Sequence, residues 1–147
     1  MKPESAVRLD RTVGRQVYKL HRLLYRLSRG RVGAKFEGRP ILLLTTTGRR
    51  TGEPRTQPLL SYPHGDAMVV VASNGGRPEM PAWLLNVEAN PEVQVQVRNE
   101  TYPAKARIAG EGEHAALWPE LTKYYPGWAH YTTLTDRPLP VVILERA

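Results

Sequence analysis

The sequence predicts an α+β fold, in which about six antiparallel strands form a small closed or split β-barrel with helices packed outside. Two observations support this prediction. Short apolar runs are separated by turns of two to four residues, which favours antiparallel hairpins. No repeat of strand, helix and strand runs along the chain, and a doubly wound parallel sheet is therefore not expected.

Length and composition indicate one ordinary domain. The chain has 147 residues, of which 41% are apolar, and this is enough for a core. It has no cysteine, which excludes disulfides, thiol catalysis and cysteine-bound metal sites. Because it has neither a run of about 18 apolar residues nor an apolar signal-peptide core, we expect a cytoplasmic protein without a membrane-spanning helix.

The net charge of +7 is concentrated near the N-terminus. Residues 11–36 contain eight basic residues and no acidic one, whereas residues 37–147 contain 11 basic and 12 acidic residues. We therefore divide the chain into an N-terminal tail with a basic helix, residues 1–36, and a nearly neutral barrel domain, residues 37–147. A nucleic-acid binder that uses the basic helix is an alternative, but the neutral domain does not favour it.

Residues 11–29 have a helical pattern. Apolar side chains recur at steps of three and four, and basic side chains follow the same steps on the opposite face. This pattern is typical of an outer helix that packs on the core and exposes its basic face. A basic amphipathic helix also suits an anionic membrane surface, here the inner face of the cell membrane, and it could instead cover a pocket.

The later elements follow from apolar runs and breakers. The runs at 41–44, 67–72 and 141–144 are typical of buried strands, and valine alternates with polar residues at 93–98. Turn residues at 63–66 separate the second strand from the third. We expect strands at 41–47, 56–62, 67–72, 93–98, 102–109 and 141–144, and helices at 78–90 and 112–125.

The stretch from Gly48 to Arg55 is the first candidate site. Its two glycines permit positive φ, which would let successive N–H groups turn inward around an anion. Its three arginines have donors suited to phosphate or carboxylate. A solvated basic hairpin tip is the equally weighted alternative.

Two further stretches could line a pocket. Ser73-Asn74-Gly75-Gly76 follows a buried strand and precedes Pro81-Ala82-Trp83, and together they could hold a flat polar ring. Tyr124, Tyr125, Trp128 and Tyr131 concentrate aromatic side chains beside a Pro-Gly break. On spacing alone, a core tryptophan with an ordinary loop is the favoured interpretation of the first stretch, and an aromatic stripe of the second kind usually belongs to a core. The four histidines lack the spacing of a metal site.

Five motifs together resemble the deazaflavin-dependent nitroreductase and F420H2-dependent quinone reductase family of actinobacteria. The resemblance implies a split β-barrel of the flavin-reductase type, with reduced coenzyme F420 as the hydride donor. The motifs are 43–55 (LLTTTGRRTGEPR), Ser73 to Gly76, 81–86 (PAWLLN), Asn90-Pro91 and Tyr124-Tyr125-Pro126 to Thr135-Asp136-Arg137.

The resemblance implies a role for each site residue. Four loop residues would hold the phosphate and oligoglutamate tail. Residues of two strands would line one side of the deazaflavin, and residues of a helix would cover its other side. An aromatic wall would face the substrate, and Ser73, Tyr125, Tyr131 or solvent would deliver the proton. The residues are, in that order: Arg49, Arg50, Thr51 and Arg55; Thr56, Gln57, Pro58, Val71, Ala72, Ser73 and Asn74; Ala82, Trp83 and Asn86; and Tyr125, Trp128 and Tyr131.

The function implied is hydride transfer from reduced F420 to a quinone, an enone or lactone, or a nitroaromatic. Three positions depart from the family pattern: Asn74 replaces a common lysine, and Leu60 and Trp128 replace tyrosines of the nitroimidazole-activating member. We therefore expect a weaker hold on the tail and do not assign activity on nitroimidazole prodrugs. A non-catalytic F420 carrier and an FMN- or heme-binding barrel are alternatives, and the protein would be a monomer or a homodimer.

Overall fold

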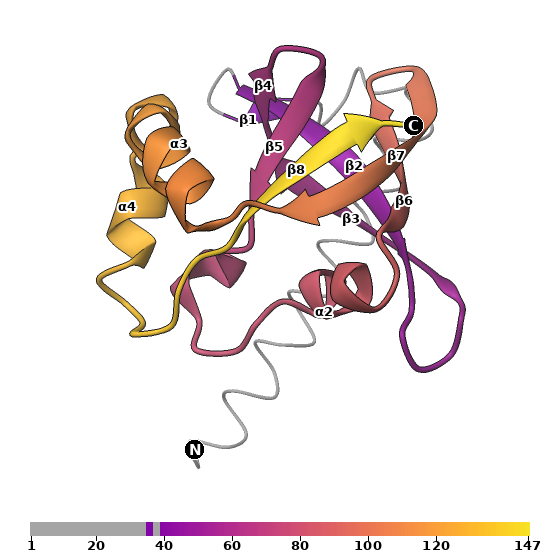
Figure 1. The fold of residues 1–147 in the computed structure, drawn as a ribbon, viewed down its shortest axis with the longest axis horizontal. Coiled ribbons are helices and arrows are strands. Elements are labelled where there is room, and N and C mark those ends of the chain that lie inside the picture. The colour runs from indigo at the N-terminus through magenta and orange to yellow at the C-terminus, as the bar shows by residue number, and fades with distance from the viewer. Residues whose placement is uncertain (1–34, 37–38) are drawn as a thin grey trace, which may run out of the picture.

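A computed structural model describes residues 35–36 and 39–147 of the chain. Its strands form one curled antiparallel sheet with helices outside it, which confirms the predicted split barrel (Figure 1). The helix predicted over residues 11–29 lies outside the described residues. The strands are β1 (Lys35–Phe36), β2 (Arg39–Thr47), β3 (Pro54–Leu60), β4 (Tyr62–His64), β5 (Ala67–Val71), β6 (Glu92–Val97), β7 (Glu100–Ile108) and β8 (Val141–Arg146).

The helices are α2 (Ala82–Ala89), α3 (Glu111–Tyr124) and α4 (Gly127–Tyr131), with a short 3₁₀ turn, η1 (Asn74–Gly76), after β5. Helix α2 begins later than expected, because Pro81 is extended, with ψ at 142°, and only precedes the first helical turn. Asn90 ends it before Pro91, as the sequence predicted. No helix within the described part of the chain is long and apolar enough to cross a membrane.

The sheet has two more strands than the six expected. β1 pairs with the start of β2, and β4 pairs with β5 through Tyr62 opposite Val69. The expected turn at 63–66 is therefore wrong in part, because Pro63 and His64 are in strand β4 and only Gly65 and Asp66 turn. The predicted boundary between residues 36 and 37 falls inside the β1–β2 hairpin.

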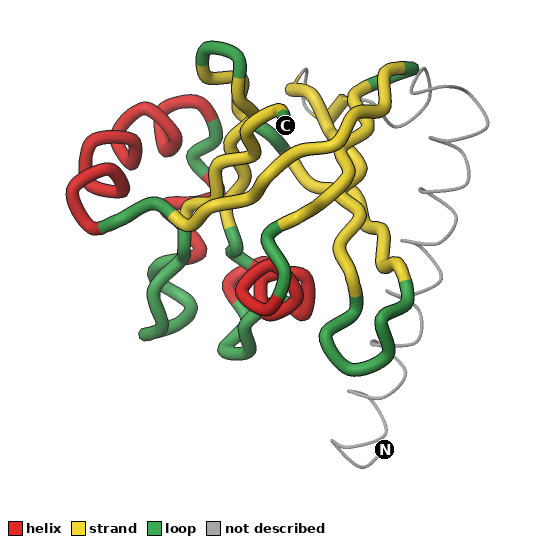
Figure 2. The backbone as a smooth tube through the Cα atoms, turned by 45° about the vertical axis from the view of Figure 1, so that its right-hand side comes forward, coloured by secondary structure: helices red, strands yellow, loops and turns green. Residues whose placement is uncertain are grey.

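Helices cover both faces of the central strands, which explains their continuous apolar runs. On β5, Val70 packs in the cluster that contains Trp83 of α2, whereas Val69 and Val71 pack in the cluster that contains Leu121 of α3. The same alternation occurs along β8. Figure 2 shows the sheet curling between these helices.

Strand β2 holds the sheet together. It pairs with β3 along its length and with β6 on its other edge, so that Leu44 lies opposite both Gln57 and Val95. Thr45 and Thr56 exchange a hydrogen bond of 2.7 Å between their hydroxyl groups. The loop after β2 therefore leaves from a strand that is paired on both sides, and it lies at the same end of the molecule as α2 (Figures 1 and 2).

Candidate cofactor-binding site

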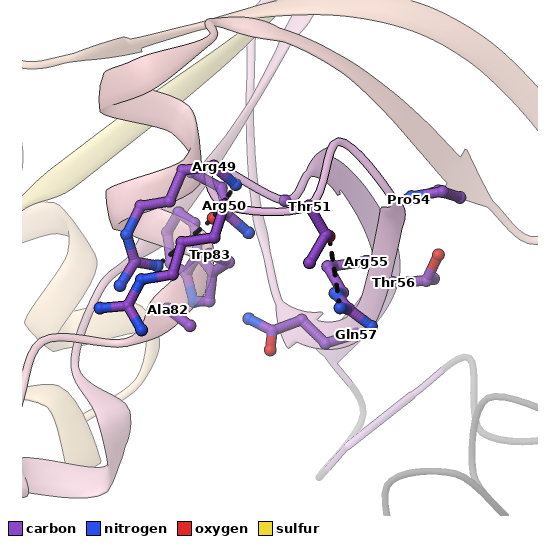
Figure 3. Close-up of a pocket in the computed structure, with 11 residues that line it drawn as sticks. Arg49, Arg50, Thr51, Pro54, Arg55, Thr56, Gln57, Ala82 and Trp83 are labelled. Carbon is purple, nitrogen blue, oxygen red and sulfur yellow. Dashed lines mark hydrogen bonds between the residues drawn. The ribbon is translucent and has the colours of Figure 1, made fainter.

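A pocket of about 430 Å³ lies between the β2–β3 loop, the start of β3 and the first turns of α2. We call residues 48–55 the arginine loop. Figure 3 shows Arg49 and Arg50 on the side of Trp83 and Ala82, with Arg55 and Gln57 across the pocket. The lining residues are Gly48, Arg49, Arg50, Thr51, Pro54, Arg55, Thr56, Gln57, Ala82, Trp83 and Asn86.

The arginine loop is closed by main-chain hydrogen bonds. The N–H of Gly48 donates to the carbonyl of Glu53 and the N–H of Gly52 donates to the carbonyl of Gly48, both at 2.8 Å. A Cβ on Gly48 would lie 3.0 Å from both the Glu53 carbonyl oxygen and Thr51 Oγ1, so this position requires glycine. Gly52 provides the left-handed turn, with φ at 73°.

Four of the main-chain N–H groups of this loop are not available for the expected anion-binding nest. The N–H groups of Gly48, Arg49, Gly52 and Glu53 all donate to acceptors within the protein. The positive character of the pocket instead comes from three exposed guanidinium groups, and none of the described lining residues is acidic. Side-chain charge, rather than main-chain geometry, therefore makes this pocket suitable for an anion.

Asn86 fixes the direction of one of these arginines. Its side chain is 4% exposed, and its Oδ1 accepts from the N–H of Arg49 at 3.1 Å and from Arg49 Nη1 at 3.5 Å. Its Nδ2 donates to Oγ1 of the buried Thr46 at 3.1 Å. Arg55 is held more loosely, through one contact of 3.5 Å between its Nη2 and Thr51 Oγ1. Arg49 is therefore oriented by α2 before any ligand arrives.

The predicted residues from β5 lie away from this pocket. Val71 and Ala72 are buried, and Ser73 and Asn74 form the turn into η1. Asn74 Nδ2 donates to the carbonyl of Glu79 at 2.9 Å, so its amide stabilises its own loop. Pro58 lies farther along β3, opposite Leu43.

The tyrosines and tryptophan of residues 124–131, which we call the aromatic segment, form a second group. The Tyr125 ring meets Trp128 edge-on at 5.3 Å between centroids, and its hydroxyl lies 3.4 Å from that of Tyr131. A Cβ on Gly127 would lie 2.5 Å from Cζ of Tyr125, so only glycine lets this ring fold back. Trp128 is 3% exposed and packs with Leu121 in the core. Trp128 therefore packs in the core against Tyr125.

Two arginines near these residues had no role in the sequence prediction. Arg39, at the start of β2, donates through Nε to the Tyr124 carbonyl, and its Cζ lies 5.6 and 5.7 Å from the ring centroids of Tyr124 and Tyr125. Burial raises the pKa of Tyr124, and the charge of Arg39 opposes that shift. No local pattern could indicate this contact, because 85 positions separate the two residues. Arg137 ends the last of the five family motifs, but nothing in the spacing of that motif indicated which residues Arg137 contacts.

The fold is a split barrel, and its arginine-lined pocket suits an anionic ligand. The heme storage protein HutZ of Vibrio cholerae shares the fold alone, at 14% identity and a TM-score of 0.55 over 73% of this chain and 81% of that one. The model of the F420H(2)-dependent quinone reductase family matches residues 17–146, and the chain belongs to this family. It is accordingly an F420-dependent oxidoreductase, as the sequence predicted.

Relatives of higher identity support this assignment. The chain is 39% identical to an F420H(2)-dependent quinone reductase of Mycobacterium tuberculosis, over 94% of this chain and 95% of that protein. It is 42% identical to a solved F420-H2 dependent reductase, FDR-A, with a TM-score of 0.66 over 73% of this chain and 95% of that one. A solved domain-swapped dimer matches at 35% identity and a TM-score of 0.69, over 98% of this chain and 100% of that one.

The described residues fit an acidic cofactor and give no sign of a metal site. Three arginines line a pocket that contains no acidic side chain among its described residues, and Gly48 leaves no room for a Cβ against the loop. Within the described ranges, no group of three histidine, aspartate or glutamate side chains could hold a metal ion.

Proposed function

We propose that the arginine pocket binds the phosphate and glutamate groups of F420, and that the enzyme reduces a quinone. The observation that supports this most directly is the convergence of Arg49, Arg50 and Arg55 on one pocket without an acidic lining residue among those described. Fork-shaped guanidinium donors match phosphate and carboxylate, and their exposure lets an incoming anion reach them.

The residues beside the arginines would form the seat for the cofactor. Thr51 would contact the tail, Thr56 and Gln57 of β3 would line one wall, and Ala82 and Trp83 of α2 would line the other. Because the amide of Asn86 is already bonded to Arg49 and Thr46, its contribution is to orient Arg49. Reduced F420, when bound, supplies a hydride to the acceptor, and the protein orients it and excludes water.

Ser73, Tyr125 and Tyr131 would serve the acceptor. Pro58, Val71, Ala72 and Asn74 would support the ring from β3 and the end of β5. The two tyrosine hydroxyls lie 3.4 Å apart, so one hydroxyl can donate a hydrogen bond to the substrate while it accepts one from the other hydroxyl. We assign the proton to this pair or to Ser73, with Trp128 holding Tyr125 in place.

Quinones are the first acceptors to test, because the family is described by quinone reduction. Enones, lactones and nitroaromatics come next, since they share a conjugated electrophile. Titrating F420 and FMN against the protein, and then mixing reduced F420 with menadione, tests the proposal. We expect F420 to bind more tightly and its oxidation to follow. Tight F420 binding without oxidation by any acceptor would instead indicate a carrier.

Two finer proposals concern assembly and location. We propose that residues 11–29, which lie outside the described residues, dock the protein on anionic lipid near quinones, since the sequence there is basic and amphipathic. Vesicle flotation that does not change when residues 1–36 are deleted would exclude this. We also propose a homodimer, because a relative at 35% identity forms a domain-swapped dimer, and light scattering can test it.

A further inference from the structure

Arg137, between α4 and β8, has its guanidinium surrounded by main-chain carbonyls. Its Nε donates to the carbonyl of Arg77 at 2.9 Å, and its Nη2 donates to that of Ser73 at 2.6 Å. Its Nη1 donates to the carbonyls of Ala72 at 3.1 Å and Pro138 at 3.0 Å. One cation therefore joins the chain after β5 to the chain before β8.

Burial makes these bonds important. Desolvation lowers the pKa of Arg137, which shows that the charge is partly withdrawn from water. A withdrawn charge is costly unless its donors are satisfied, and bonds to charged groups are among the stronger ones. Arginine suits this position because its planar fork can reach several carbonyls at once, whereas lysine has a single nitrogen.

The end of β5 needs such support because the main chain changes direction sharply there. The ladder with β8 ends at Val71, and Ser73 then takes helical angles, with φ at −80°. Asn74, Gly75 and Gly76 follow with φ values of 48°, 63° and 79°. Carbonyls of successive strand residues point in opposite directions, yet the carbonyls of Ala72 and Ser73 both accept hydrogen bonds from one guanidinium.

The same loop packs directly on the aromatic segment. A Cβ on Gly76 would lie 3.0 Å from Cδ1 of Leu134 and 3.3 Å from Cβ of Tyr131, so the loop and the end of α4 are in close contact. We propose that Arg137 is a positioning residue, which holds the main chain of Ser73 against this segment and thereby sets Ser73 relative to Tyr131. This inference rests on the proposed roles of Ser73 and Tyr131 in the reaction.

The variant Arg137→Lys tests this role, because it keeps the charge but not the fork. In the protein without cofactor, we expect amide hydrogen exchange at residues 72–77 to rise about tenfold, and that of the arginine loop to stay the same. With F420H2 and menadione, kcat should fall about tenfold while KM for F420H2 and Kd for F420 stay within about threefold.

Arg146→Lys is the matched control. Arg146 lies on β8, is exposed, and bonds to Glu100 at 2.6 Å, so its replacement should change neither exchange at residues 72–77 nor kcat. Should Arg137→Lys fold poorly, Arg137→Ala titrated with free guanidinium provides a second test, in which kcat should recover as guanidinium fills the space.

Each outcome decides one step. Unchanged hydrogen exchange at residues 72–77 would overturn the claim that Arg137 holds this stretch of main chain, whatever the activity of the variant. Faster exchange with unchanged kcat, or a loss of F420 affinity as large as the loss of kcat, would overturn the positioning role. If the wild-type protein failed to oxidise F420H2 with any of the acceptors, the proposed function and this role in it would fail. The exchange result would still decide whether Arg137 holds the main chain of residues 72–77.

Discussion

The arginine loop and the aromatic segment, which we propose to serve one site, are stabilised in opposite ways. In the loop, Arg49, Arg50 and Arg55 are exposed, and the guanidinium groups of Arg49 and Arg55 each make a long hydrogen bond of 3.5 Å. In the aromatic segment, Trp128 is buried, and Tyr125 folds back on Gly127. Changes in the loop should therefore alter cofactor affinity and spare stability, whereas changes in the aromatic segment should alter stability first.

Trp128→Ala should have the largest effect. It removes a large side chain that is 3% exposed, which typically costs about 3–5 kcal/mol of unfolding free energy. Denaturant unfolding measures this loss. Trp118→Ala, on the partly buried face of α3, is the control and should cost clearly less. Near-wild-type stability of Trp128→Ala would indicate that the indole is not part of the core and faces the substrate side instead.

Arg49→Ala combined with Arg50→Ala should have the next largest effect, on affinity alone. Losing two charged donors should weaken F420 binding about 100-fold, since a hydrogen bond to a charged group contributes roughly 1.5–3 kcal/mol. Unfolding free energy, and kcat at saturating cofactor, should change little. Lys105→Ala with Lys123→Ala removes the same charge from exposed positions elsewhere and should leave affinity unchanged. Normal F420 binding by the arginine variant would make the loop a surface turn.

Asn86→Leu should have a smaller effect, which lowers both cofactor affinity and stability. It frees Arg49 and leaves the buried Thr46 hydroxyl without this partner, so F420 binding should weaken about tenfold and stability should fall by about 1–3 kcal/mol. Adding it to Arg49→Ala should weaken binding less than the product of the single effects. Asn90→Ala, at the other end of α2, is the control. Full additivity would show that Asn86 does not act through Arg49.

The smallest expected effect concerns the exposed ion pairs of Arg107 on β7, which bonds to Glu113 at the start of α3 and to Glu145 on β8. Hydrogen bonds from Arg107 lower the pKa of Glu113 below its ordinary value of 4.5, so the folded protein binds this proton less readily than the unfolded chain. The contribution of Glu113 is therefore complete above that value and is lost as pH falls through the lowered pKa. Glu113→Gln should slightly reduce the acid-dependent loss of stability. A melting temperature that falls equally in both proteins as pH drops below 4.5 would contradict it.

The local pattern of the chain was sufficient for most of the fold. Apolar runs marked the six longer strands, and Pro and Gly marked the ends of α2 and α3. β1 and β4 escaped prediction because they have two and three residues, too few for a period to emerge. Pro63 and His64 also have a composition typical of turns, and only their pairing with Ala67 and Met68 makes them a strand.

The site could be predicted less completely because its geometry depends on distant contacts. The arginine loop and the residues of α2 were foreseen, and the structure brings them to one pocket. Whether an aromatic residue faces the core or a pocket cannot be read from spacing alone, and Trp128 faces the core. The contact of Arg39 with Tyr124 joins residues 85 positions apart, and that of Arg137 with Ser73 joins residues 64 positions apart, so no local pattern records them.

The double pairing of β2 also limits how this pocket can change. A one-residue insertion within the strand would turn Leu42 and Leu44 away from the core and shift both of its partner strands. The main-chain bonds that Gly48 makes with Gly52 and Glu53, and the bond of the Arg49 N–H to Asn86, leave residues 50 and 51 as the tip whose length can vary. Redesign of this enzyme for a longer or shorter anionic tail should therefore begin at those two positions and leave the strands intact.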